Sequence, residues 1–267
     1  MLLPETHPCA APMLNVHPAA ADGFASAADT YARARPEYPA AINCWLRDAL
    51  GLGEGRTVLD LGAGTGKFTR SLLACGARVI AVDAVPAMLE QLTARFATVE
   101  AYVANATELP LPDLSVDAVV CAQSFHWFAK SETLAEIHRV LKPGGVLGLV
   151  WNVRDESVGW VRALTEIFAA YQGDAPRYRT MQWQQAFRGA AFGPLSEGVF
   201  ANDHHGPAEQ VILGRFLSTS FIAALPDAER AVATDKVRAL IAATPALQGT
   251  EVIFPYRTHA FHCRKIG

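Results

Sequence analysis

The residues with the clearest capacity for chemistry lie in one short loop, where an aspartate is followed by three glycines at alternate positions: Asp60, Gly62, Gly64 and Gly66. Glycines spaced in this way let the chain turn sharply, and they let a ligand approach the backbone where a Cβ atom would collide. A phosphate-binding P-loop needs Gly-x-x-x-x-Gly-Lys-Ser/Thr, but Lys67 is followed by Phe68. A dinucleotide fingerprint needs Gly or Ala three residues after its second glycine, where this chain has Lys67. The loop alone is also compatible with a plain turn.

Two further residues could act on a ligand held at this loop. Asp83 follows the apolar run Arg78–Val82, about 20 residues after the loop, where nucleotide-binding α/β units place an acid that accepts hydrogen bonds from ribose hydroxyls. An aspartate there could also cap the helix expected over Pro86–Phe96, and the two roles can coexist. His126, within the run Gln123–Phe128, is a candidate general base or substrate partner, with a structural role about equally weighted.

Three passages of the chain carry a family resemblance. The pattern Asp-x-Gly-x-Gly-x-Gly resembles motif I of class I S-adenosylmethionine (SAM) dependent methyltransferases. Tyr102–Leu111 resembles the family's third motif, with Asn105 in place of the usual acid before Ala106, which leaves an uncharged acceptor for the adenine. Arg139–Gly145, with the sequence RVLKPGG before a strand, is a further signature. Together with the runs HWF, WNVRDE and PYRT, these passages are similar to a bacterial small-molecule branch related to trans-aconitate methyltransferases.

The resemblance implies that SAM is the cofactor and covers roughly Phe24 to Arg264, most specifically Val58 to Trp151. The residues that it places at the cofactor are Tyr31, Arg35, Asp60, Gly62, Ala63, Gly64, Gly66, Asp83, Ala84, Met88, Asn105, Ala106 and Gln123. The substrate is expected to contact Tyr38, His126, Trp127, Trp151 and Arg154, with His126 as the catalytic candidate. No histidine, cysteine or carboxylate spacing indicates a metal site.

The elements that must position these residues alternate between apolar strands and amphipathic helices. Strands are expected over 57–61, 78–82, the start of 102–111, 115–122, 146–151, 198–203 and 250–265. Helices are expected over 24–34, 40–50, 68–74, 86–96, 131–141 with Ser131 as N-cap, 159–171, 209–224 and 227–243. The class implied by the resemblance is α/β, a Rossmann-like doubly wound sheet of about seven strands with an antiparallel edge and a C-terminal helical cap. We expect a flexible tail over 1–23, a SAM-binding core over 24–157, and the cap with the last two strands over 158–267.

Composition narrows the class of protein. Hydrophobic residues make up 51% of the 267 positions, which is ample material for a core, and no apolar run reaches membrane-spanning length. A net charge of −3 and a pI near 6.2 give no electrostatic sign of nucleic-acid binding. The five cysteines are scattered without metal-type spacing: Cys9, Cys44, Cys75, Cys121 and Cys263. We expect a cytoplasmic enzyme with a small-molecule substrate and no nucleic-acid or membrane partner; the sequence leaves its oligomeric state unknown.

Two chemistries are open for a SAM-dependent methyltransferase on this sequence. A carboxylate acceptor is ionised at neutral pH and needs no base, and Arg154 or Arg177 would anchor it. A hydroxyl, phenol or amine acceptor needs a base, for which His126 is the first candidate and the pair His204-His205 the second. We expect methyl transfer to an oxygen. An N- or C-methyltransferase, a nicotinamide-dependent oxidoreductase and a non-catalytic SAM-binding module remain alternatives.

Overall fold

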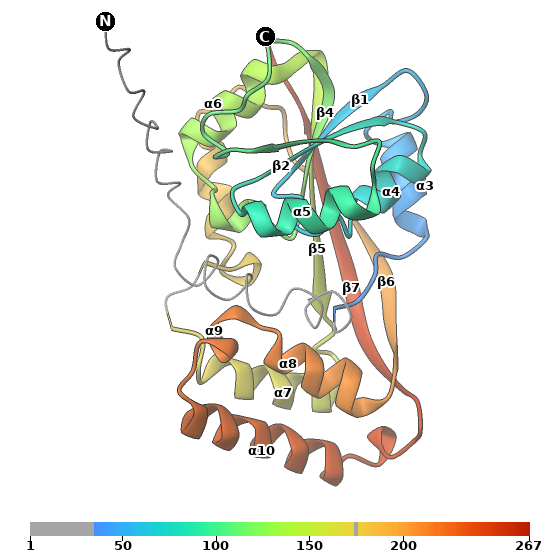
Figure 1. Ribbon diagram of the computed structural model, residues 1–267, viewed down its shortest axis with the longest axis vertical. Coiled ribbons are helices and arrows are strands. Elements are labelled where there is room, and N and C mark those ends of the chain that lie inside the picture. Colours follow the sequence, from blue (N-terminus) through green and yellow to red (C-terminus); the bar gives the residue numbers. More distant parts are fainter. Residues whose placement is uncertain (1–34, 174–175) are drawn as a thin grey trace, which may run out of the picture.

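The computed structural model describes residues 35–173 and 176–267, which form one seven-stranded sheet with the order β3-β2-β1-β4-β5-β7-β6 (Figure 1). The strands from β3 to β5 are parallel, and β7 runs antiparallel to both β5 and β6. The bounds are β1 (Thr57–Leu61), β2 (Arg78–Asp83), β3 (Glu100–Val103), β4 (Val116–Ala122), β5 (Leu141–Arg154), β6 (Ser196–Gly206) and β7 (Val252–Arg264). The predicted α/β sheet with an antiparallel edge is confirmed.

Helices cover both faces of the parallel part of the sheet. The helices are α3 (Ala41–Asp48), α4 (Thr69–Ala74), α5 (Pro86–Arg95), α6 (Ser131–Val140), α7 (Gly159–Ala169), α8 (Arg215–Leu217), α9 (Ser220–Ala223) and α10 (Asp227–Ala243). Successive side chains of a strand point to opposite faces. In β1, Val58 therefore packs with α3, α4 and α5, whereas Leu59 packs with α6 on the other face. The helix expected over 24–34 lies outside the described residues.

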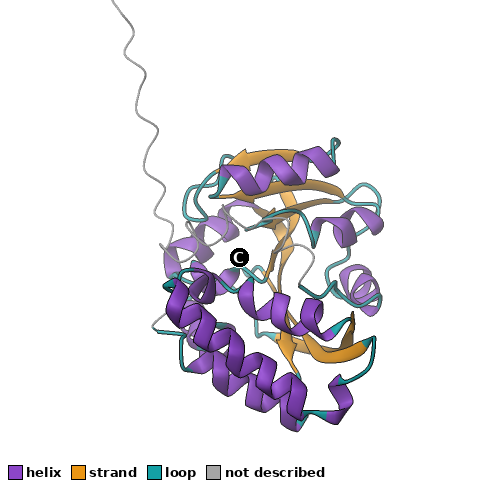
Figure 2. Cartoon of the chain, turned by 60° about the horizontal axis from the view of Figure 1, so that its bottom comes forward, coloured by secondary structure: helices purple, strands orange, loops and turns teal. Residues whose placement is uncertain are grey.

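The helices α7, α8, α9 and α10 do not cover the parallel strands. They gather at one end of the sheet, around a third apolar cluster that includes Phe168, Phe216 and Phe254. β5, β6 and β7 are the long strands, and they extend toward these helices (Figure 1). In Figure 2 the long helices lie side by side at this end, where α10 contacts α7. The proposed division of the chain near residue 157 stays a prediction. No helix within 35–173 or 176–267 is long and apolar enough to cross a membrane.

The helix predicted over 209–224 is broken into three pieces. A π-helical turn (Glu209–Gly214) leads into α8 and then α9. The break has a local cause, because the hydroxyls of Ser218 and Thr219 both donate to the carbonyl of Arg215, at 3.0 and 3.2 Å. Such side-chain bonds compete with the helical backbone pattern. Arg215 is the first residue of α8, three residues before the break, and it lines two cavities.

Two local predictions are corrected around α6. Ser131 is not the N-cap: that position is Lys130, and the Ser131 hydroxyl bonds to Glu132. The run 142–145 does not separate α6 from a later strand, because β5 begins at Leu141. The ladder with β4 accommodates these residues in a bulge, since Val116 pairs with Leu141 and Ala118 already pairs with Val146.

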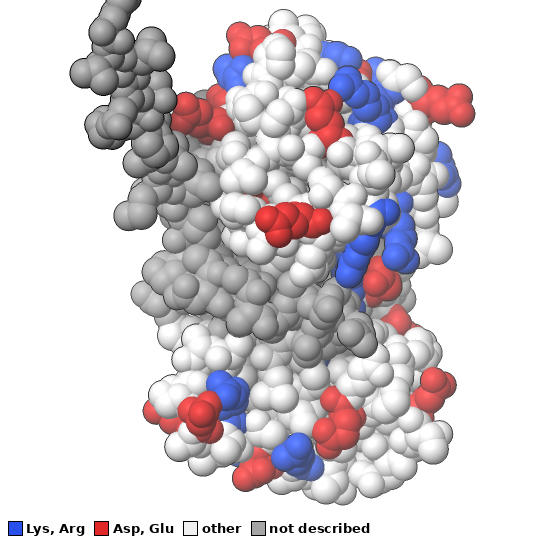
Figure 3. All heavy atoms as spheres, viewed as in Figure 1, with Lys and Arg blue, Asp and Glu red and all other residues white. Residues whose placement is uncertain are grey.

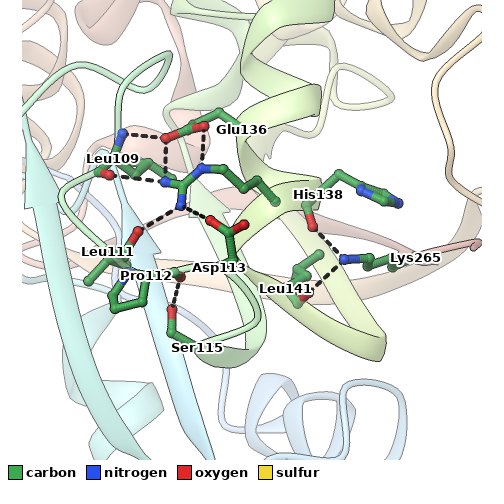
Figure 4. A network of polar contacts seen from close by, with 10 residues as sticks. Leu109, Leu111, Pro112, Asp113, Ser115, Glu136, His138, Leu141 and Lys265 are labelled. Carbon is green, nitrogen blue, oxygen red and sulfur yellow. Dashed lines mark hydrogen bonds and ion pairs between the residues drawn. The ribbon is translucent and has the colours of Figure 1, made fainter.

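A polar clamp fastens α6 to the segment that precedes β4. The Arg139 guanidinium donates to Glu136, Asp113 and the carbonyls of Leu109 and Leu111 at 2.6–3.1 Å. Figure 4 shows these acceptors converging from the loop and the helix. The two carboxylates raise the pKa of Arg139 above its ordinary value, and the guanidinium stays charged.

Arg139→Met should therefore lower the free energy of unfolding by about 1.5–3 kcal/mol, the range for hydrogen bonds to charged groups. Arg78→Met is the matched control, because Arg78 pairs with Glu100 on the exposed surface and should cost less than about 1 kcal/mol. Urea denaturation of both variants measures the difference. Equal losses would show that the clamp contributes no more than a surface ion pair.

Candidate active site

The three glycines of the loop after β1 have positive φ angles and serve different purposes. A Cβ on Gly62 would lie 2.5 Å from Ser124 Cβ, and one on Gly66 would lie 2.9 Å from the Phe96 ring, so both positions exclude side chains for packing. A Cβ on Gly64, at φ +56°, would meet nothing within 4 Å. Gly64 therefore faces open space at the end of β1, where open α/β sheets bind ligands.

Asp60 lies buried beneath this loop. Its Oδ2 accepts a hydrogen bond from the Thr69 hydroxyl at 2.7 Å, while its Oδ1 is buried without a partner among the described residues. Burial, with a smaller contribution from Asp83, raises the pKa of Asp60 to about 7. An orphaned carboxylate oxygen beside an open space fits the ammonium group of an amino-acid ligand.

Asp83, at the end of β2, holds two backbone segments. Its Oδ2 accepts from Gly64 N at 2.8 Å and its Oδ1 accepts from Val85 N at 2.9 Å. Burial raises the pKa of Asp83, and these hydrogen bonds oppose the shift. Each carboxylate oxygen has a second lone pair, so the bond to the turn before α5 and a bond to a ribose hydroxyl are compatible.

A first cavity opens above the loop. Its lining includes most of the residues predicted to contact the cofactor: Arg35, Asp60, Gly62, Ala63, Gly64, Asp83, Ala84, Met88, Ala106 and Gln123. Tyr38 and Trp127, expected at the substrate, also line it. Gly66 and Asn105 do not line it, and Tyr31 lies outside the described residues. Their contacts with a cofactor stay predictions.

The segment Arg35–Tyr38 forms part of the cavity wall, and two sets of polar contacts hold it in place. Lys67 Nζ donates to the Arg35 carbonyl at 2.6 Å and pairs with Glu37 at 3.1 Å. The Glu37 carbonyl accepts from the amides of Asn202 and Asn152 at 2.9 and 3.3 Å. Lysine in the position that excluded a dinucleotide fingerprint thus ties this segment to the glycine loop.

A second cavity adjoins the first. The two share six lining residues: Arg35, Gln123, Trp127, Asn152, Arg215 and Tyr256. The predicted substrate residues His126, Trp151 and Arg154 line the second cavity, as do Arg177 and Arg179. The histidines His204 and His205, on β6, line neither cavity. Gln123, at φ +58°, marks the junction, where a non-glycine residue in this conformation is unusual.

Aromatic faces and hydroxyls hold the arginines of the second cavity. The Arg154 guanidinium lies 4.1 Å from the centre of the Phe168 ring in α7, and its Nε donates to Thr165. Arg177 lies 4.3 Å from the centre of the Phe221 ring in α9. Burial, with a smaller contribution from nearby arginines, lowers the pKa of both Arg154 and Arg177 to about 10, so both remain cationic at neutral pH.

Within the described ranges, one carboxylate lines this cavity, and it is already paired. Glu156 forms a two-point ion pair with Arg179. No carboxylate of the described chain pairs with Arg154, Arg177 or Arg215, and Arg177 Nε is buried without a hydrogen-bond partner. The cavity therefore presents three cations to a bound molecule.

His126 lies half-buried at the wall of the second cavity. The indole nitrogen of Trp151 lies 3.1 Å from His126 Nδ1. Burial lowers the pKa of His126 to about 3, and the charges of Arg177 and Arg35 act in the same direction. The imidazole is therefore neutral across the physiological pH range.

The comparisons with known proteins agree with this geometry. Residues 59–149 match the family model described as a methyltransferase domain. An uncharacterised methyltransferase-like protein of Schizosaccharomyces pombe is 40% identical over 239 residues, which cover 88% of this chain and 92% of that protein. The chain belongs to the methyltransferase family. An uncharacterised methyltransferase of Mycobacterium tuberculosis is also 40% identical, over 88% of this chain and 92% of its own length.

A solved structure from Anaeromyxobacter dehalogenans, described as a candidate type II methyltransferase, is similar to this methyltransferase with a TM-score of 0.60 and 27% identity. The match covers 87% of this chain and 97% of that one. The enzyme is a class I, SAM-dependent methyltransferase. A nicotinamide-dependent oxidoreductase is thereby excluded, and assignment to the trans-aconitate-related branch stays a prediction.

The residues that line the first cavity fit SAM. Asp60 Oδ1 would accept from the ammonium of the methionine part, Asp83 from the ribose hydroxyls, and Gly64 leaves the space that a side chain would fill. Bound SAM supplies a methyl group made electrophilic by the sulfonium. Arg215 and Tyr256 at the junction were missed by the sequence analysis, although PYRT pointed to the neighbourhood of Tyr256.

Asp60→Asn should stabilise the SAM-free methyltransferase most at neutral and higher pH. Because the pKa of Asp60 is about 7 in the folded protein and 3.8 ordinarily, stability falls as pH rises between these values and stays lower above 7. We expect the free energy of unfolding to rise by about 2–4 kcal/mol at pH 7.5, and by less at pH 5. Denaturation at the two pH values measures this, and an equal gain at both would contradict the assigned pKa.

Proposed function

We propose that this methyltransferase transfers the methyl group to a carboxylate oxygen of a small molecule that carries more than one anionic group. The observation that carries the proposal is the set of three cations, Arg154, Arg177 and Arg215, that face the second cavity without carboxylate partners in the described ranges. Buried charges are costly unless they are paired, so a ligand with complementary charge is the natural occupant. Because a single carboxylate would neutralise only one of the three cations, we expect the ligand to carry more than one anionic group.

The same cavity lacks a group suited to remove a proton. His126 has a pKa of about 3, burial raises the pKa of Tyr178 to about 12, and Glu156 is occupied by Arg179. An alcohol, phenol or ammonium acceptor must lose a proton during transfer, whereas a carboxylate is already ionised at neutral pH. These groups therefore favour an acid acceptor over a hydroxyl or an amine.

The residues of the chain would act mainly through alignment and exclusion of water. Arginine binds a carboxylate in a planar, two-point geometry, so Arg177 and Arg154 would fix the orientation of the acceptor. Trp127, which lines both cavities, would separate the junction from bulk water. The acceptor oxygen forms the new C–O bond as the C–S bond breaks, the electron pair stays on sulfur, and no proton moves.

One distant relative agrees with transfer to oxygen. A protein of Serratia marcescens named as a malonyl-[acyl-carrier protein] O-methyltransferase is 35% identical over 128 residues, which are half of its length. The match covers 45% of this chain, so the substrate of that protein carries no weight for the second cavity.

The test is the chemical nature of the product. SAM labelled in the methyl group is incubated with the enzyme and with matched panels of mono-, di- and tricarboxylates, phenols and amines. A methyl ester releases volatile labelled methanol in alkali, whereas an ether, an N-methyl or a C-methyl product keeps its label. We expect alkali-labile product from acids with two or more carboxylates. Stable label from a phenol or an amine would overturn the proposal.

The absence of nucleic acid among the partners and a cytoplasmic location stay predictions. On the face shown in Figure 3, acidic and basic side chains are interspersed, without a broad area of one sign among the residues that are coloured. A small-molecule substrate is consistent with that surface, because charge of one sign is gathered in the second cavity instead.

A further inference from the structure

The contact between Trp151 and His126 is held in a rigid setting. Trp151, in β5, is 1% exposed, and its ring centre lies 4.8 Å from those of both Tyr178 and Trp183. Phe261, in β7, packs against the same ring. The indole cannot turn away without disrupting this aromatic column, so its N–H stays directed at His126 Nδ1, 3.1 Å away.

The chemistry of the two rings assigns the proton of the imidazole. An indole nitrogen only donates hydrogen bonds, so His126 Nδ1 must offer its lone pair. A neutral imidazole carries one N–H, which must then be on Nε2. Within residues 35–173 and 176–267, the one hydrogen bond of the His126 ring is that at Nδ1, and His126 lines the second cavity. The ring therefore turns a donor, not a proton acceptor, toward the cavity.

We propose that Trp151 is a positioning residue that holds His126 in the Nε2–H tautomer, so that His126 donates a hydrogen bond to the acceptor oxygen. This role rests on the proposed carboxylate acceptor. The charged groups that act on His126 are Arg177 and Arg35, and both are cationic, which favours an anionic group beside the imidazole N–H. A base in this position would instead require a free lone pair at Nε2.

Nitrogen NMR of the full-length enzyme tests the tautomer directly. In protein labelled with ¹⁵N-histidine, the signals lost in His126→Gln identify the ring. We expect a protonated Nε2 and an unprotonated Nδ1, unchanged between pH 5.5 and 8. A protonated Nδ1 in the wild type would overturn the inference.

Trp151→Phe keeps an aromatic ring and removes the N–H. We expect a mixture of tautomers at His126, a fall of about 3- to 10-fold in kcat/KM for the acceptor, and unchanged SAM affinity. Trp183→Phe is the matched control, because it alters the same column without a bond to His126. An unchanged tautomer in Trp151→Phe, or the same change in Trp183→Phe, would assign the contact to packing alone.

Two replacements of His126 separate a donor from a base. Glutamine retains an N–H donor and cannot act as a base, whereas leucine retains neither property. We expect His126→Gln to keep at least about threefold more activity than His126→Leu, which corresponds to one hydrogen bond. Equal loss in both would contradict the donor role. The two proposals can fail independently: if the tautomer is as expected but no methyl ester forms, the carboxylate acceptor is wrong and the tautomer assignment stands.

Discussion

Replacing Gly64 by valine should weaken SAM binding by at least about 100-fold while the sheet stays folded. The left-handed conformation at φ +56° costs a non-glycine residue about 1–2 kcal/mol, and a branched side chain would enter the open space of the first cavity. The strain lowers stability, whereas the lost space weakens binding; since each 1.4 kcal/mol is tenfold in affinity, a clash that costs about 3 kcal/mol of binding gives this loss. Titration calorimetry with SAM and with S-adenosylhomocysteine gives the dissociation constants.

Gly51→Val is the matched control for backbone strain. Gly51, after α3, has φ +66°, and a Cβ there also meets nothing within 4 Å, but it lines neither cavity. It should lose similar stability and keep wild-type SAM affinity. If Gly64→Val also binds SAM normally, the loop does not contact the cofactor.

The largest effect on the acceptor is expected from Arg177→Met. Removing one partner of a buried, hydrogen-bonded charge pair costs about 2–5 kcal/mol, so kcat/KM should fall by at least about 30-fold while SAM affinity is retained. Arg154→Met should behave in the same way. Because Arg177 is a cation without a carboxylate partner among the described residues, its removal should also raise the melting temperature of the substrate-free enzyme.

Arg188→Met, an exposed arginine outside both cavities, is the control for charge alone. Steady-state kinetics at saturating SAM should show a flat turnover from about pH 6 to 8 in all of these variants, because His126 stays neutral well above its pKa of about 3. Unchanged kcat/KM in both Arg177→Met and Arg154→Met would place the acceptor elsewhere. A rise of turnover with pH that disappears in His126→Gln would restore a basic role for His126.

The sequence by itself determined the fold class, the family and the cofactor. β1, β2 and α10 have the expected limits to within a residue, because each is set by local apolar spacing and by nearby glycine or proline residues. Asp60, Gly64 and Asp83 line one cavity, because their positions relative to one another follow from one β-loop-α-β unit; their contacts with the cofactor stay predictions. Short-range spacing was sufficient to bring residues together wherever all of them belong to one such unit.

Only the tertiary structure decided how the second cavity is assembled. Tyr256 faces Arg154 because β7 pairs antiparallel with β5 in the register that joins these two residues, and Asn152 meets Thr258 by the same ladder. Arg215 lies three residues before a helix break that hydroxyl groups produce, and Trp151 reaches His126 across two neighbouring strands. Strand register and helix breaks depend on contacts between residues far apart in the chain, which local periodicity does not encode. The role of His126 was left open by the sequence for this reason: its proton is assigned by the Trp151 indole, 25 residues away.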